Sequence, residues 1–212
     1  MLEPVLAPSL SPMTETAYAA RTNHAFVLTE TVTVAELMHQ GATADDIRRQ
    51  VLVEDLFQLR SQASRERALQ TILKRLHQVP ETYVHLIATG NIDTRRYTIL
   101  FLILREHRLL RELVAEILLD KIKAFDFILT AADLRTFFEG KREQSTTVAA
   151  WSDSTYKKVM SSTVQVIVNA GLLQPTPQRG NYEIRSIPIP SVLRQQLLND
   201  GFGHYLALML DI

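Results

Sequence analysis

Positive and short polar side chains gather between residues 155 and 165 in a pattern that could bind phosphates. Read as a helix, this stretch places them on, or next to, the side opposite its apolar positions. The members are Thr155, Lys157, Lys158, Ser161, Ser162 and Gln165. Lysine ammonium groups neutralise phosphate charge, and hydroxyl and amide groups donate to phosphate oxygens and base edges. The pattern favours nucleic-acid binding, and the alternative is a polar helix face that meets only water.

A helix-turn-helix is predicted to carry this polar face. Thr130 is a capping residue for a first helix, whose apolar side is formed by Leu134, Phe137 and Phe138. After a polar bend, Ser152 opens the second helix. Its apolar positions step by three and four along the chain: Tyr156, Met160, Thr163, Ile167 and Ala170. A helix-turn-helix commonly places its second helix in a DNA groove.

A β-hairpin is predicted to follow the second helix as a wing. Gly171 is suited to the left-handed position that ends a helix. The segments Leu172–Gln174 and Tyr182–Arg185 flank the turn Arg179–Asn181, which carries a cation at its tip. Three further cations of this region complete the candidate nucleic-acid contacts: Arg179, Lys141 and Arg142.

The second helix depends on its period and its caps, because its composition also suits a strand. The run Val164–Val168 is largely β-branched and could pair in a sheet. Winged-helix-like modules also bind proteins, so the same elements could instead form a protein-protein module.

Trp151, the only tryptophan, directly precedes the predicted cap Ser152. An apolar side chain at that position commonly packs back onto the first turns of the helix. We therefore expect Trp151 to be mostly buried and to make no contact with nucleic acid.

The composition is that of an ordinary soluble globular protein, with 46% hydrophobic and 22% charged residues among 212. Twenty-three basic residues balance 23 acidic ones, which argues against binding driven by bulk charge. Residues 121–200 hold ten Lys or Arg against seven Asp or Glu, so a local basic surface is permitted. The chain has no cysteine, no signal-peptide pattern and no apolar run near the 20 residues of a membrane span. We expect a cytoplasmic protein that does not enter a membrane.

A second helix-turn-helix is predicted in the N-terminal half. The segment Thr33–Glu36 has the capping-box pattern of a helix that Gly41 ends, and Thr43 opens the next helix. A third helix is expected to start at Ser64 and to run to His77. Its outward face, a second candidate for nucleic-acid contact, carries Arg67, Gln70, Lys74 and, at the margin, Arg75. Solvated helix faces are the commoner explanation of such charges.

The remaining segments suggest how these parts are joined. Residues 1–15 are predicted to be a flexible, proline-containing arm, and residues 16–92 the N-terminal helical domain. Residues 93–123 are the most apolar part and are expected to form a hydrophobic helical spine. Residues 124–190 contain the winged-helix-like module, and residues 191–212 a last helix, Ser191–Asn199, with an apolar tail that docks on this chain or on a partner. The predicted fold is mainly α: a helical bundle with a C-terminal winged-helix-like module.

No catalytic motif stands out. The sequence lacks the phosphate-binding loop, the nucleophile elbow and the zinc-protease helix, and its six histidines lack metal-ligand spacing. We expect no enzymatic activity, no catalytic residue, no metal, no cofactor and no small-molecule substrate.

Two sets of short fragments, one in each half of the chain, match a known pattern in their order and spacing. The C-terminal fragments are Leu129–Asp133, Phe137-Phe138, Trp151-Ser152, Thr155, Lys157-Lys158 and Ala170–Leu173. The N-terminal fragments are Val51–Leu56, Arg60-Ser61, Arg67 and Ile72–Leu76. Together they resemble the BrxA family, small accessory proteins of the BREX bacteriophage-exclusion systems. The resemblance covers most of residues 20–175 and depends on the order and spacing of the fragments, since none is specific alone.

The resemblance implies a helical body with winged-helix-like parts, binding to double-stranded DNA and service in phage defence beside other BREX proteins. The family's helical part has been likened to the antitermination factor NusB, which keeps RNA open as a ligand. We therefore expect a DNA-binding accessory protein with weak sequence preference. The alternatives are an adaptor that holds defence proteins together and an RNA-binding antitermination-like factor.

Overall fold

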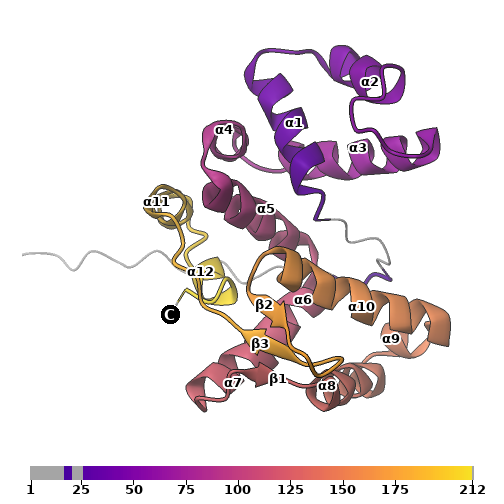
Figure 1. The fold of residues 1–212 in the computed structure, drawn as a ribbon, viewed down its shortest axis with the longest axis vertical. Helices are drawn as coiled ribbons and strands as arrows, with labels where there is room; N and C mark the ends of the chain where they lie inside the picture. Colours follow the sequence, from indigo (N-terminus) through magenta and orange to yellow (C-terminus); the bar gives the residue numbers. More distant parts are fainter. Residues whose placement is uncertain (1–16, 21–25, 212) are drawn as a thin grey trace, which may run out of the picture.

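The computed structural model describes residues 17–20 and 26–211. The predicted N-terminal arm, residues 1–15, and the end residues 16 and 212 of two predicted domains lie outside the described residues. The described chain is mostly helical and stacks three parts along its long axis (Figure 1). This confirms the predicted class, a mainly α fold with a small sheet toward the C-terminus.

The N-terminal part contains four helices: α1 (Leu28–His39), α2 (Ala44–Leu52), α3 (Gln62–His77) and α4 (Glu81–Thr89). Thr43 caps α2 as predicted, in a reciprocal capping box with Asp46. The predicted capping box at Thr33 is wrong, because α1 already runs through it and the Thr33 hydroxyl donates to the Thr29 carbonyl at 3.0 Å. The third helix also begins earlier than predicted, since Ser61 rather than Ser64 is its cap.

The central part is built on α5 (Ile92–Glu106), followed by α6 (Arg108–Leu113), the π-helical turn η1 (Val114–Leu118) and α7 (Leu119–Lys123). The whole run Ile99–Leu104 is buried, in agreement with a hydrophobic spine. At the break between α5 and α6, the buried Arg111 donates to the carbonyls of Leu104 and Arg105 at 2.6 and 3.0 Å. These bonds satisfy carbonyls that the end of a helix leaves without partners.

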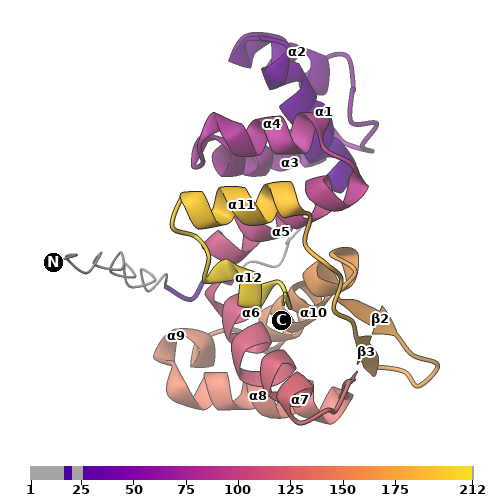
Figure 2. The same cartoon turned by 90° about the vertical axis from the view of Figure 1, so that its left-hand side faces the viewer.

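The C-terminal tail packs against α5 of the same chain. It contains α11 (Ser191–Asn199), whose bounds match the prediction, and α12 (Tyr205–Leu208). Both lie alongside α5 in Figure 2. The Tyr205 ring meets Phe101 edge to face at 5.1 Å, and the Ser186 hydroxyl donates to the Leu210 carbonyl. The apolar tail therefore completes the protein's own core.

The module below the spine combines β1 (Ile128–Leu129), α8 (Ala131–Gln144), α9 (Thr146–Ala149), α10 (Asp153–Asn169), β2 (Leu173–Pro175) and β3 (Tyr182–Ile184). Its antiparallel sheet has the order β1-β3-β2, with Leu129 opposite Tyr182 and Gln174 opposite Glu183. The predicted hairpin is present, and β1 is an additional strand. The arrangement is consistent with the predicted winged-helix-like module.

Candidate nucleic-acid interface

Local capping and tertiary packing together form α10. The Ser152 hydroxyl accepts from the backbone N–H of Thr155 and so caps the helix. The β-branched run continues as helix because Val164, Val166 and Ile167 are all buried in the core. Packing of this face thus decides against the strand alternative.

Trp151 at the entrance to α10 is half-buried and packs against the core. Its position next to the cap agrees with the prediction, whereas its burial is less than predicted. The backbone N–H of Trp151 donates to the Val148 carbonyl, which tightens the turn before the helix.

Most predicted contact residues of α10 lie on its solvent side. Lys157, Lys158, Ser161 and Gln165 are exposed, whereas Thr155 and Ser162 are half-buried. Within the described chain, no carboxylate pairs with either lysine. Their charges are therefore available to an external anion.

The half-buried hydroxyls of α10 have partners on their own helix. Ser162 donates to the Val159 carbonyl at 3.0 Å, and the Thr155 hydroxyl accepts from Ser152 at 2.9 Å. Gln165 donates to the Asn169 side chain at 2.8 Å, and this exposed contact can exchange for a ligand.

A groove of about 750 Å³ lies between α8, α10 and the hairpin. Its lining includes the half-buried residues Tyr156, Met160 and Tyr182. The sequence placed Tyr156 and Met160 on the core side of the helix; the structure shows that they pack against the core on one side and open into the groove on the other.

Four cations and two carboxylates stand around this groove. They are Arg135, Arg142, Lys157, Arg179, Glu139 and Asp153. Arg142 is exposed, lies 5.3 Å from the centre of the Tyr156 ring and pairs with Asp153 at 3.4 Å. Arg135, which the sequence analysis missed, lies on the exposed side of α8, and only the fold of the hairpin brings it to the site.

Lys141 is buried, so the prediction that it contacts nucleic acid is wrong. It is 5% exposed, and its Nζ lies 2.6 Å from Glu116 and 3.0 Å from Glu112. Burial would lower the pKa of Lys141, but the hydrogen bonds to these carboxylates outweigh it and raise the pKa. Lys141 instead joins α8 to the spine.

Glu112 is the shared acceptor of this buried cluster. Burial would raise the pKa of its carboxyl, but hydrogen bonds from Arg108, Lys141 and Tyr18 outweigh it and hold the pKa below its usual value. The Arg108 guanidinium lies 2.7 Å and the Tyr18 hydroxyl 2.9 Å from the carboxylate.

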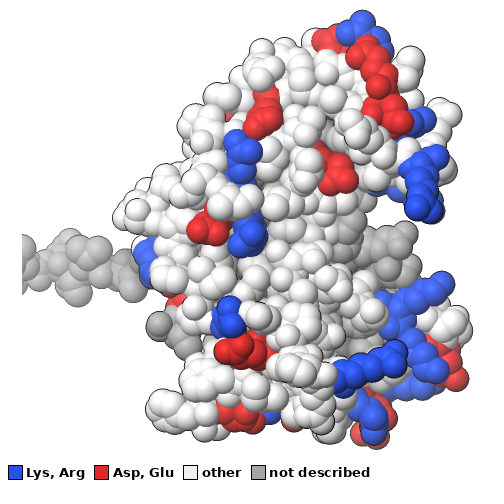
Figure 3. All heavy atoms as spheres, viewed as in Figure 1, with Lys and Arg blue, Asp and Glu red and all other residues white. Residues whose placement is uncertain are grey.

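The candidate face on α3 is smaller than predicted. Arg67, Gln70 and Lys74 are exposed, but Arg75 is 3% exposed and its Nε lies 3.3 Å from the Glu106 carboxylate. Arg75 is thus a buried partner of α5 rather than a surface cation. In Figure 3, basic side chains gather near the right-hand end of α3 and again around the right-hand end of α10, on one face of the molecule.

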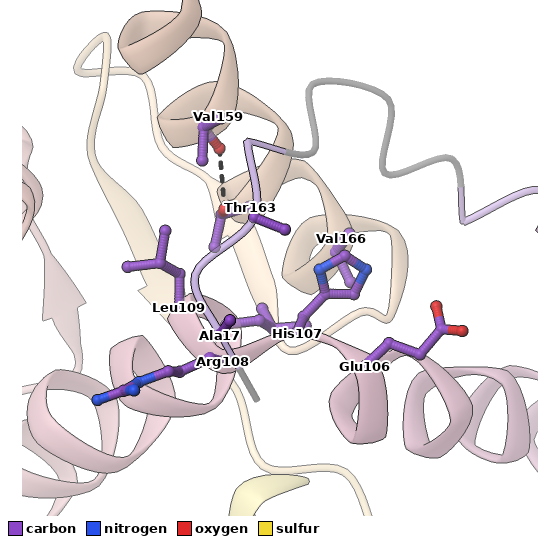
Figure 4. A pocket seen from close by; sticks show the side chains of 10 residues that line it. Ala17, Glu106, His107, Arg108, Leu109, Val159, Thr163 and Val166 are labelled. Atoms are coloured by element: carbon purple, nitrogen blue, oxygen red, sulfur yellow. Dashed lines mark hydrogen bonds between the residues drawn. The ribbon is translucent and has the colours of Figure 1, made fainter. Parts of the chain in front are cut away.

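A second, much smaller cavity lies where the break between α5 and α6 faces α10 (Figure 4). His107 and Leu109 line it from one side, and Thr163, whose hydroxyl donates to the Val159 carbonyl, from the other. Its volume of about 10 Å³ is close to the least that holds one water molecule, so a substrate has no room there. Among the described residues, no three His, Cys, Asp or Glu side chains are placed to hold a metal ion.

The family model for BrxA matches residues 17–201, which include every element of the site. The chain belongs to the BrxA family. Two relatives are both called BREX protein BrxA. The one from Bacillus cereus is 28% identical over 79% of this chain and 84% of its own length. The one from Escherichia coli is 25% identical over 79% of each chain.

A solved structure has the same fold as this BrxA-family chain. It is the crystal structure of an uncharacterized protein from Magnetospirillum magneticum, which superposes with a TM-score of 0.71 at 20% sequence identity. The match covers 87% of this chain and 93% of that one. Over the described part of the chain, no helix is both long and apolar enough to cross a membrane.

Proposed function

We propose that this BrxA-family protein is a DNA-binding, non-enzymatic component of a BREX bacteriophage-defence system. Membership of the BrxA family supports the assignment to a BREX system, because a relative of this chain is named BREX protein BrxA. The observation that supports DNA binding is the exposed face of α10, where Lys157 and Lys158 lack carboxylate partners within the described chain. Arg135 and Arg179 flank this face across the groove.

The chemistry of this face favours phosphate contacts over base reading. Two lysines and short hydroxyls follow a phosphate backbone well, whereas bidentate base recognition uses arginine, asparagine or glutamine aimed at one base. The two exposed amides on this side of α10, Gln165 and Asn169, are already hydrogen-bonded to each other at 2.8 Å. We therefore infer double-stranded DNA as the ligand, with weak sequence preference and strong salt dependence.

Salt titration of DNA binding tests this proposal. If about six phosphates are neutralised, raising the salt from about 50 to 200 mM lowers the affinity on the order of a thousandfold. The ligands are one duplex, its separate strands and the matching RNA, measured by gel shift. An affinity for duplex DNA that does not change with salt would contradict the electrostatic mechanism, and tighter binding of RNA would assign the face to RNA.

A charge-matched pair of variants tests the face itself. In Lys157→Ala/Lys158→Ala, we expect the slope of log affinity against log salt to fall by about two, because two phosphate contacts are lost. The control Arg48→Ala/Lys123→Ala removes the same net charge from exposed positions on α2 and α7. Equal loss in both double variants would show a bulk charge effect and remove α10 from the interface.

An adaptor role has one specific observation in its favour. Phe125, Phe127 and Ile128 are 85%, 46% and 39% exposed and follow one another between α7 and α8. Neighbouring exposed apolar side chains commonly mark protein contacts. The variant Phe125→Ser/Phe127→Ser should then bind DNA normally but lose co-purification with its BREX partners, and unchanged co-purification would contradict the adaptor role.

A further inference from the structure

The groove beside α10 combines aromatic and thioether side chains with a surrounding excess of cations. Tyr156 and Tyr182 line it together with Met160, and the buried Leu134 and Val164 add to its apolar lining. Its volume of about 750 Å³ is in the range of sites that enclose small organic groups. The groove therefore has room for more than the edge of a duplex.

Charge around the groove favours an anionic occupant. Arg142 has its carboxylate partner Asp153, which neutralises one cation. The three other rim cations, Arg135, Lys157 and Arg179, have no ion pair within the described residues and face only one further acid of the rim, Glu139. The rim is therefore net positive.

We propose that the groove receives an unpaired nucleobase together with its flanking phosphates. Aromatic side chains stack on bases of any sequence, and neighbouring cations hold the backbone on either side. Lys157, Ser161 and Gln165 belong both to the exposed face of α10 and to the groove wall, so a strand that follows α10 passes the groove mouth. In an intact duplex the base faces are stacked on each other, so only an opened or mismatched site offers one.

The inference rests on the proposed DNA binding and adds a ligand preference to it: DNA with a locally opened duplex. The affinity of the protein is measured by fluorescence anisotropy for a duplex and for the same duplex with a short central stretch of unpaired bases. We expect the opened duplex to bind about tenfold more tightly, which is within the range that one stacked base contributes.

Variants at Tyr182 separate stacking from charge. Tyr182→Leu removes the ring without changing charge and should reduce the advantage of the opened duplex to about threefold or less, while the paired duplex binds as before. Tyr182→Phe keeps the ring and should retain the full advantage. A second measurement needs no variant: 2-aminopurine placed in the opened stretch should lose emission on binding, because it stacks on tyrosine.

Each negative result would contradict one specific claim. Equal affinity for paired and opened duplexes, or unchanged 2-aminopurine emission in the complex, overturns the inference and leaves duplex binding intact. Absence of binding to every DNA overturns the proposed function. An acidic peptide that binds the wild type but not Tyr182→Leu, with both DNA affinities unchanged by the variant, would assign the groove to a protein partner and overturn the inference.

Discussion

Replacing Lys141 tests whether this residue stabilises the fold or binds a ligand. The substitution Lys141→Met keeps an unbranched apolar side chain and removes the ammonium group, which lies 5.2 Å from the centre of the Phe137 ring and is the shared cation of Glu112 and Glu116. Breaking a buried ion pair by removing one partner costs about 3–5 kcal/mol of unfolding free energy.

The structure places this cost at the lower end of the range. The Glu116 side chain is 48% exposed, so water can solvate it, and Glu112 keeps Arg108 at 2.7 Å. We therefore expect a loss of about 3 kcal/mol, which for a chain of this length corresponds to roughly 6–12 °C in melting temperature. Urea and thermal unfolding measure both values.

The exposed neighbour provides the control for this experiment. Arg142→Met removes a positive charge one residue away, from the surface, and should change stability by about 0.5 kcal/mol or less. DNA affinity of folded Lys141→Met, measured well below its melting temperature, should equal that of the wild type. Wild-type stability combined with weakened DNA binding would refute the reasoning and return Lys141 to the interface.

Three further predictions concern acid stability, the tryptophan and the α3 face. Because the pKa of Glu112 in the folded protein lies below its unfolded value of about 4.3, the stabilisation from this carboxylate is complete above that pH and is lost as the pH falls through the folded pKa. Glu112→Gln should therefore make the free energy of unfolding, measured by urea titration at several acidic pH values, less dependent on pH. An unchanged pH dependence would contradict this role of Glu112. Trp151→Ala should cost about 2 kcal/mol, below the 3–5 of a fully buried ring, and DNA should leave the Trp151 emission unchanged; quenching by DNA would place the ring in the interface. Arg67→Ala/Lys74→Ala should lower the salt slope of DNA binding if α3 contacts the same duplex, and an unchanged slope limits the interface to α10.

Helix caps were predicted well because they are local. Thr43, Thr130 and Ser152 each accept a hydrogen bond from a backbone N–H three residues later, so sequence neighbours carry the whole signal. The helix α11 (Ser191–Asn199) was located for a similar reason, since Pro190 is its N-cap and Gly201, with φ +76°, follows its C-cap. Where a cap pattern lies inside a longer helix, as at Thr33, the same rule misleads.

Burial of side chains beside the apolar face of a helix could not be derived from hydrophobic periodicity. Lys141 and Arg75 are of residue types that are usually found on the surface. Each is instead buried and pairs with a carboxylate on another element, 25 and 31 residues away in the sequence, respectively. The strand β1 was missed because two residues are too few to show an alternating pattern. These features depend on contacts between segments far apart in the sequence.

The groove, too, could not be predicted from the sequence. Helical spacing assigned Tyr156 and Met160 to the core because their stripe continues into Thr163 and Ile167, which are buried. Whether the N-terminal end of that stripe, at Tyr156 and Met160, contacts protein or an open space depends on where the hairpin lies relative to α8 and α10. In the structure the hairpin reaches the start of α8 and leaves the space between them open.

The hairpin tip is attached to α8, and this attachment sets the shape of the site. The Ala131 backbone N–H donates to the Asn181 side chain at 3.2 Å, and Gly180 turns beside it with φ +84°. A Cβ at Gly180 would lie 3.2 Å from the Ala131 Cβ, a tight contact, and the positive φ at this position favours glycine. At its other end, α8 is joined to the spine by Lys141. Arg179, Arg135 and Lys157 are therefore held on elements that are fixed to one another, and a ligand that bridges them meets a preorganised surface, whose ordering entropy is already spent on folding.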